Sequence, residues 1–449
     1  MTLMTDRRLF LAGLGATTAL TGCSSLGGEA APTGMPRVAD VPPAAPQSVG
    51  MSADLTTSIN AMMKGHIDAD RITGGVTAVA RKNKLVHFAA HGMFDREAGT
   101  PMRTNALFRM MSSTKPVTGV ALLQQREAGK LDLSDPIAKF IPELKNMTVW
   151  KPEAQAARAA ARRANPTQRP SPPSPDEVVP ANREITLTDL ATHTSGLNGT
   201  ASGFSLDGGG RTLANYIPRL KDTPLDFQPG TRWAYSATTG PDVLARVIEI
   251  TSGMPYDKYL EAHVFNPIGM KDARHNPNAE QRSRRVPRYA KPRNGAAGGG
   301  GAGWQRAETS DQPETTTYFA GAYGLSASAM DYLQFEQMLL NEGTIHGNRV
   351  LKPESVRLMR SNLVGDLYKG IENTTRGTGF GVLVRVVLDP ATCGCGRSTG
   401  GFGWGGAYGT MSWTDPEEKL TAVIMIQQSV DQVQRDFESV IRRAIVAKA

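Results

Sequence analysis

Metal-binding residues are scarce in this 449-residue sequence. It contains three cysteines, Cys23, Cys393 and Cys395, and seven histidines that are scattered along the chain. No cysteine or histidine pair has the spacing of a zinc site, so we expect no metal ion. The neighbouring Cys393 and Cys395 leave two alternatives open, a small disulfide in an oxidising compartment or two loop thiols.

The amino terminus lacks an apolar run long enough to cross a membrane. Arg7 and Arg8 precede an apolar stretch over residues 9–20, whereas a spanning helix needs about 20 residues. The arginine pair resembles a twin-arginine export signal, and the letters LTGC that end at Cys23 resemble a bacterial lipoprotein box. A plain secretory signal with a chance cysteine is the alternative.

These signals predict a periplasmic protein that is anchored to a bacterial membrane. Residues 1–22 are the expected signal peptide, and Cys23 is the expected lipidation site. Residues 23–49 are rich in Gly, Ala, Pro and Ser and are expected to form a flexible tether. The expected folded domain then covers residues 50–449.

The sequence also lacks a broad basic region of the kind that binds nucleic acid. Its formal charge is +8, from 50 Lys and Arg against 42 Asp and Glu. Residues 151–170 carry a net +4 and residues 281–294 a net +6, so the rest of the chain carries 8 minus 10, or −2. These loop-like segments lack interleaved aromatics. We therefore expect no nucleic-acid partner. The two basic segments are expected to be solvated loops, and the alternative for residues 281–294 is a contact for anionic molecules.

Strand-like patterns lie at both ends of the chain, and helical patterns lie between them. Residues 74–92 alternate like a β-hairpin, and a mainly helical subdomain is expected over about residues 117–300. Within it, residues 152–182 are expected to form a surface insertion. This order predicts one sheet built from both termini, an α/β (α+β) fold. Further helices are expected over residues 117–129, 330–343 and 430–447, and strands over residues 380–388, 407–413 and 420–428.

The stretch MSSTKPVTG, residues 111–119, combines a helix start with a candidate nucleophile. Pro116 lacks a backbone N–H and fits only the first turn, so we expect the helix to begin at Ser112 or Ser113. Lys115 then shares a helix face with Ser112, and a neutral lysine amine can take the serine proton. A capping serine beside a solvated lysine is the alternative, but the apolar run before the serine favours a sheltered position.

Two later stretches contain other parts that acyl transfer needs. Tyr235 precedes an amphipathic helix, and a tyrosine beside a lysine can pass protons to and from a reacting oxygen. The glycine-rich residues 401–413 let a backbone N–H approach a reacting carbonyl closely. A core tyrosine and a glycine-rich turn are the alternatives for these stretches taken singly.

In this order, the three motifs resemble those of the serine beta-lactamase and penicillin-binding-protein superfamily, and most closely its class C-like branch, the family VIII carboxylesterases. The resemblance implies a beta-lactamase/D,D-peptidase-like fold, in which helices flank an antiparallel sheet and a mainly helical subdomain is inserted. It begins near residue 50 and is interrupted by residues 152–182. The matching stretches are GMSADL, SSTKPVTGVALLQQREAGKLDLSDPIAKFIPEL, ITLTDLATHTSGL, FQPGTRWAYS, FNPIGMKD and WGGAYGTMSWTDPEEKLTAVIMIQ.

The resemblance also implies the roles of individual residues. Ser112 is the implied nucleophile, and Lys115 and Tyr235 are the implied base and proton relay. The backbone N–H groups of Ser112 and Ala407 are the implied oxyanion hole. No cofactor is needed for this chemistry.

The sequence departs from the lactamase pattern at two positions. Ala237 ends the tyrosine motif, where the lactamase pattern has an asparagine. Trp404 opens the third motif, where the lactamase pattern has a lysine or histidine that holds a substrate carboxylate. Trp404, Gly405 and Gly406 are expected to contact the substrate, with the Trp404 ring as an aromatic wall. Both changes resemble the esterase branch and weaken the case for β-lactams or peptidoglycan stems. His193 is expected to be a packed turn histidine.

We therefore expect an exported serine hydrolase that cleaves carboxylic esters through an acyl-enzyme on Ser112. The expected substrate is a small-molecule ester or an ester of the cell envelope. One alternative is a β-lactamase or D,D-peptidase that uses the same residues. Another is a catalytically silent envelope lipoprotein, against which the intact Ser112, Lys115 and Tyr235 argue. The oligomeric state stays open.

Overall fold

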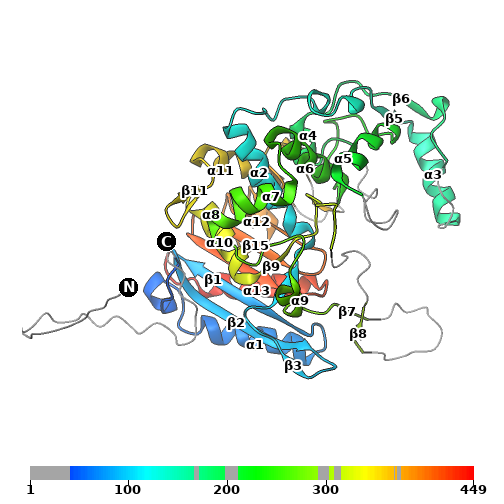
Figure 1. Ribbon diagram of the computed structural model, residues 1–449. Helices are drawn as coiled ribbons and strands as arrows, with labels where there is room; N and C mark the ends of the chain where they lie inside the picture. The colour runs from blue at the N-terminus through cyan, green and yellow to red at the C-terminus, as the bar shows by residue number, and fades with distance from the viewer. Residues whose placement is uncertain are drawn as a thin grey trace, which may run out of the picture.

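The main feature of the fold is an eight-stranded antiparallel sheet whose strands come from both ends of the chain (Figure 1). The computed structural model describes residues 41–165, 171–197, 211–291, 303–307, 315–368, 370–371 and 376–449. Carboxy-terminal strands lie directly beside amino-terminal strands, which confirms the predicted sheet. The strand order is β12 (Thr378–Phe380), β13 (Arg385–Val387), β14 (Phe402–Gly405), β15 (Met411–Asp415), β16 (Leu420–Met425), β1 (Gly74–Arg81), β2 (Lys84–Asp95) and β3 (Thr100–Pro101).

One face of the sheet is covered by two helices from opposite ends of the chain, α1 (Leu55–Asp68) and α13 (Asp431–Ala444). Leu55, Ile59 and Met63 recur every four residues along α1, which places their side chains on one helix face. They form one buried cluster with Phe437 of α13 and Trp413 of β15. This cluster joins the first and last helices of the folded body through the sheet.

The opposite face of the sheet packs against α2 (Lys115–Glu127) and α10 (Ala329–Leu340). Helix α10 carries the buried Glu336, whose carboxylate accepts hydrogen bonds from Ser412 (2.5 Å) and Thr414 (2.6 Å) of β15. A buried carboxylate is costly unless it has such partners. The two hydroxyls therefore hold α10 in one position on the sheet.

The mainly helical subdomain lies between the two halves of the sheet in sequence. Its helix α3 (Pro152–Ala164) projects from the body at the upper right of Figure 1 and has no buried residue, as expected of a surface insertion. The other α-helices that the structure describes between these halves are α4 (Leu187–Ala191), α5 (Leu213–Tyr216), α6 (Thr239–Ser252), α7 (Tyr256–Leu260), α8 (Asn266–Ile268), α9 (Ala279–Ser283) and α11 (Pro353–Met359), besides α2 and α10. Helix α12 (Pro390–Cys393) lies later, between β13 and β14. The paired short strands are β4 (Leu107–Arg109) with β9 (Ser326–Ser328), β5 (Thr148–Trp150) with β6 (Val178–Pro180), β7 (Tyr289–Ala290) with β8 (Gln305–Arg306), and β10 (Thr344–Ile345) with β11 (Asn348–Arg349).

Two of the predicted strands have different bounds in the structure. Residues 380–388 do not form one strand, because the chain reverses after β12, where Leu383 has a φ of 58°, and returns as β13. Residues 407–413 begin with a turn, in which the N–H of Gly409 donates to the carbonyl of Gly406 (2.8 Å), and β15 starts only after it. In the first case buried apolar residues continue through the reversal, so their pattern alone does not reveal it.

The folded body begins before residue 50. Pro46–Val49 forms a short 3₁₀ helix, and the N–H of Ala44 donates to the carbonyl of Leu85 in β2 (2.9 Å). The predicted tether is therefore wrong for residues 41–49, which pack on the domain. Residues 23–40 lie outside the described residues.

The structure distinguishes between the two alternatives for the neighbouring cysteines. Cys393 and Cys395 are joined by a disulfide at the end of α12. Cys23 lies outside the described residues. In the part of the chain that the structure describes, no helix is both long and apolar enough to cross a membrane.

The Glu336→Gln substitution is expected to make stability less dependent on pH. Burial raises the pKa of Glu336 to about 7, so the folded protein keeps this proton at a pH where the unfolded chain has lost it. The free energy of unfolding of the wild type therefore falls as the pH rises from about 4.5 to 7. Across that window the variant should gain about 3 kcal/mol relative to the wild type.

Urea unfolding at pH 5 and pH 8 measures this gain. The exposed Glu354→Gln on α11 is the matched control. A difference between Glu336→Gln and the wild type that stays constant with pH would contradict the prediction.

Candidate active site

Ser112 lies where a short strand leads into a buried helix. Strand β4 pairs with β9 and continues to Met110, whose N–H donates to the carbonyl of Leu325 (2.9 Å). Met111–Thr114 then forms a 3₁₀ turn, and α2 follows directly with Pro116 in its first turn. The expected helix start, at residue 112 or 113, falls inside this turn.

The backbone around the serine has an unusual conformation. Met111 has a φ of 48°, which is uncommon for a residue other than glycine. Its neighbours are fixed from two sides, because the hydroxyl of Tyr332 donates to the carbonyl of Ser113 and that of Thr410 to the carbonyl of Met110 (3.0 Å). Such conformations persist where the surroundings hold them, and they are common at functional sites.

The amine of Lys115 is completely buried and contacts the serine hydroxyl. Its Nζ lies 3.0 Å from Oγ of Ser112, 2.7 Å from the carbonyl oxygen of Ala237 and 3.0 Å from that of Ala322. A neutral amine has two N–H groups and one lone pair. The charged amine donates to all three oxygens. When the amine is neutral, the two carbonyls can keep both N–H groups, and the lone pair is then directed toward Ser112. This arrangement suits proton transfer from the hydroxyl.

Tyr235 lies beside the same amine. The Nζ of Lys115 is 5.0 Å from the centroid of the Tyr235 ring. The indole N–H of Trp404 donates to the Tyr235 hydroxyl (3.3 Å), and the two rings are 5.5 Å apart. The structure thus brings the serine, the tyrosine and the WGG motif together.

The glycine-rich turn between β14 and β15 packs against the backbone in front of Ser112. A Cβ atom on Gly406 would lie 2.2 Å from the carbonyl oxygen of Met110 and 2.3 Å from the hydroxyl of Thr410. The hydroxyl of Thr410 also lies 3.0 Å from that of Ser113. Only glycine permits this close approach. Ala407, the next residue, is exposed at the edge of the site.

Asp242 was missed by the sequence analysis, and it holds one of the carbonyls that contact Lys115. It is buried in the first turn of α6, where it accepts hydrogen bonds from the N–H of Ala322 (2.9 Å) and the hydroxyl of Tyr318 (2.8 Å). Burial raises the pKa of Asp242 to about 7, although its two hydrogen-bond donors act in the opposite direction. The only signal in the sequence was an acidic residue at the start of an apolar helix.

His193 packs among aromatic rings behind Tyr235. Its ring centroid lies 4.9 Å from that of Tyr235, 5.2 Å from Phe380 and 5.9 Å from Trp233. Burial holds the pKa of His193 well below its ordinary value. The imidazole is therefore neutral and belongs to the wall of the site.

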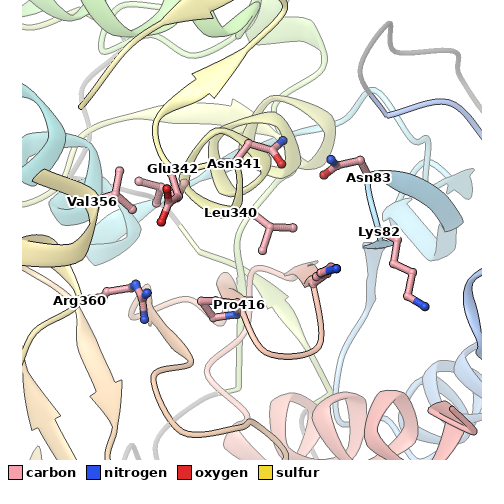
Figure 2. Close-up of a pocket in the computed structure, with 10 residues that line it drawn as sticks. Lys82, Asn83, Leu340, Asn341, Glu342, Val356, Arg360 and Pro416 are labelled. Atoms are coloured by element: carbon pink, nitrogen blue, oxygen red, sulfur yellow. The ribbon is translucent and has the colours of Figure 1, made fainter. Parts of the chain in front are cut away.

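A cavity of about 430 Å³ lies elsewhere, at the opposite end of the sheet strands (Figure 2). Figure 2 shows Asn83 from the β1–β2 turn, Asn341 from the end of α10, and Arg360 and Pro416 around it. It contains none of the predicted site residues. Among the described residues, no group of three or more His, Cys, Asp or Glu side chains is placed to hold a metal ion.

A second serine motif does not form a site of this kind. Residues 396–400 have the spacing G-x-S-x-G, which in α/β-hydrolases marks a serine on a sharp turn from a strand to a helix. Here the motif lies between β13 and β14 of an antiparallel sheet. The N–H of Ser398 donates to Asp415 (2.7 Å), and the neighbouring Arg397 pairs with Glu438 (2.7 Å). The strand-to-helix turn is therefore missing.

Comparison with known proteins agrees with this geometry. A sequence model of the family described as Beta-lactamase matches residues 59–445. The chain belongs to the beta-lactamase family. The predicted superfamily is thereby confirmed.

Relatives of this beta-lactamase-family protein include esterases. Protein Rv1367c of Mycobacterium tuberculosis is 34% identical over 383 residues, 81% of this chain and 88% of the relative. Esterase EstB of Burkholderia gladioli is 29% identical over 422 residues, 88% of this chain and 96% of the relative. The solved structure of EstCE1, a hydrolase with promiscuous acyltransferase activity, has a TM-score of 0.68 at 23% identity and covers 88% of this chain and 99% of its own. The protein thus has the fold of a hydrolase family with esterase members.

The Gly406→Ala substitution is expected to displace the backbone of the β14–β15 turn and to destabilise the protein. The added methyl group would overlap the Met110 carbonyl, so the β14–β15 turn must move away from Ser112. Overpacking of this kind costs about 1–3 kcal/mol. Urea unfolding measures the loss, with Gly65→Ala in α1, where a Cβ has open space, as the matched control. Equal stabilities of the two variants would contradict the prediction.

Proposed function

We propose that this protein is an exported serine hydrolase that cleaves carboxylic esters through an acyl-enzyme on Ser112. The observation that carries the proposal is the 3.0 Å contact between the Ser112 hydroxyl and the buried amine of Lys115, whose other two contacts are carbonyl oxygens. A surface lysine that pairs with a capping serine would not be enclosed in this way. The esterase relatives support the same reaction class.

In the proposed first step, the hydroxyl proton of Ser112 passes to the neutral Lys115 amine while Oγ bonds to the ester carbonyl carbon. The carbonyl oxygen becomes an oxyanion, which the N–H groups of Ser112 and Ala407 would stabilise. When the bond to the alcohol breaks, the departing oxygen takes that proton from Lys115. Water then gives a proton to Lys115 and attacks the acyl carbon. The bond between this carbon and Oγ breaks, Oγ takes the proton from Lys115, and the carboxylic acid is released.

Tyr235 is the proposed proton relay in these steps. Its ring lies against the Lys115 amine, and its hydroxyl accepts a hydrogen bond from Trp404. Because that indole N–H occupies one lone pair, the phenol O–H stays available as a donor toward a departing alcohol oxygen. The proposed relay role of Tyr235 requires its O–H to point toward the departing oxygen.

An ester is a better proposed substrate than a β-lactam because of two residues that face the site. Ala237 has no side-chain amide to bind an acylamino group. Trp404, packed on Tyr235 and Phe380, presents an aromatic ring where a cation would bind a lactam carboxylate. A β-lactamase or D,D-peptidase activity is the second candidate, because both use the same serine and lysine.

The site of action is also a proposal. The export signal and the lipoprotein box support an anchor at Cys23 in the bacterial envelope, with the enzyme in the periplasm. Small-molecule esters and ester-bearing envelope molecules are the proposed substrates. No cofactor has a role in the proposed mechanism.

Replacing Ser112 with Ala is expected to abolish the hydrolysis of a 4-nitrophenyl ester, with a rate loss of about 10⁴-fold or more. The same variant should lose labelling by a fluorophosphonate probe, because the probe reacts with the activated hydroxyl. The wild type should turn over the ester far faster than a chromogenic cephalosporin. Initial rates on both substrates measure this preference.

Ser113→Ala is the matched control, since Ser113 is adjacent but its hydroxyl faces Thr410. Ester hydrolysis that survives in Ser112→Ala would remove the nucleophile assignment. A faster rate on the cephalosporin would favour the second candidate function. A wild type that turns over no activated ester would favour the silent envelope protein.

Replacing Cys23 with Ser is expected to move the protein from the membrane fraction to the soluble periplasmic fraction of a bacterial host, because the acyl chains attach to the cysteine sulfur and its amine. Cell fractionation and metabolic labelling with palmitate measure the change. Wild type and variant that fractionate alike would contradict the anchor.

A further inference from the structure

The arginine-rich segment contacts two parts of the chain that lead to the site, strand β4 before Ser112 and the turn that contains Ala407. On one side, the N–H of Leu107 donates to the carbonyl of Arg284, and the N–H of Val286 donates back to Leu107, both at 2.8 Å. Leu107 begins β4, which leads into Ser112. The segment is thereby fixed to the strand in front of the nucleophile.

On the other side, the same segment reaches the residue that follows Ala407. The guanidinium carbon of Arg288 lies 4.6 Å from the centroid of the Tyr408 ring. Ala407 and Tyr408 are adjacent, with about 3.8 Å between their Cα atoms. The guanidinium group therefore lies on the side chain that follows the residue proposed for the oxyanion hole.

Other cations of this segment are engaged in structural contacts. Arg284 pairs with Asp272 (2.6 Å) and Glu280 (2.7 Å), and Lys291 pairs with Asp70 (3.1 Å). Such pairs neutralise the charge locally. These two side chains therefore fix the segment to the protein and are not available to bind a ligand.

Arg288 differs because it has no acidic partner among the residues that the structure describes. The acids near its neighbour Tyr289 are already occupied. The Tyr289 hydroxyl donates to Glu97 (2.7 Å), and Asp95 pairs with Arg306 (3.5 Å). The charge of Arg288 therefore remains available to a bound molecule.

Stacking also prepares the guanidinium group for an anion. An arginine that lies on an aromatic face directs its N–H groups outward in the plane of the guanidinium. Arg288 is half-buried, so its orientation is restrained while its edge stays accessible. Two parallel N–H groups match the two oxygens of a carboxylate.

We infer that Arg288 binds an anionic group of the substrate, so that the preferred substrates are esters that also carry a carboxylate or a comparable acid. This inference rests on the proposed function, since it needs an ester in the site. The geometry explains how an aromatic wall at Trp404 can coexist with recognition of an acid. The cation comes from the segment that crosses β4, and not from the WGG motif.

Two matched substrate pairs test the inference. The first places the acid on the acyl side and compares mono-4-nitrophenyl adipate with 4-nitrophenyl hexanoate. The second places it on the alcohol side and compares 4-acetoxybenzoate with its methyl ester. The wild type should prefer the acidic member in at least one pair, and its kcat/KM for that member should fall as salt rises.

In Arg288→Gln the ratio of kcat/KM values, acidic over neutral, should fall about tenfold in the preferred pair. Arg288→Lys should recover only part of it, because an ammonium group lacks the planar pair of donors. Arg282→Gln is the matched control. It removes the same charge from the same segment, where Arg282 donates only to the carbonyl of Pro277 (2.7 Å), and it should leave the ratio unchanged.

The outcomes separate this inference from the proposed function. A wild type that hydrolyses neither member of either pair would contradict the proposed function itself. A wild type that hydrolyses them, with ratios that Arg288→Gln leaves unchanged or that Arg282→Gln lowers equally, would overturn only the role of Arg288. The ratio stays informative if the variant is less stable, because both members of a pair meet the same folded fraction.

Discussion

The enclosure of one lysine amine is the constraint on which the rest of the site depends. Lys115 has no exposed surface, and its Nζ contacts oxygens from three separate segments, Ser112, Ala237 and Ala322. A buried amine without these partners would be strongly unfavourable. The amine therefore requires three segments to be in place: the turn before α2, the tyrosine motif and the segment after Tyr318. Asp242 holds the segment after Tyr318 by accepting a hydrogen bond from the Ala322 N–H.

The sheet provides the rigidity that this arrangement needs. Its neighbouring strands β16 and β1 come from opposite ends of the chain, and they pair over six residues from Val76 to Arg81. Helices cover both faces, with Glu336 of α10 bonded to β15. The β14–β15 turn can therefore be held against Met110 at a distance that excludes even a methyl group. An N–H group positioned this firmly is preorganised for a developing oxyanion.

The surroundings of the proposed nucleophile include an aromatic wall, and we infer that Arg288 adds a cation to them. Ring contacts join His193 to Tyr235, Tyr235 to Trp404, and Trp404 to Phe380. Burial keeps the imidazole of His193 neutral. Arg288 approaches from the other flank on the face of Tyr408. This division suits a substrate with an apolar part and an acidic part, because each part then meets a surface of its own kind.

The sequence by itself determined the order of the strands and helices along the chain, because this order follows from local periodicity. It also determined the Ser112 to Lys115 spacing on the helix that Pro116 starts, and it determined the family through the matching motifs. It misplaced the strands near residues 383 and 407, where reversals depend on backbone conformation rather than on hydrophobic pattern. Only the tertiary structure decided that Asp242 supports the lysine and that Arg288 lies on the ring of Tyr408. Their roles arise from contacts across 80 and 120 residues of chain, and no local pattern records which distant group a side chain will meet.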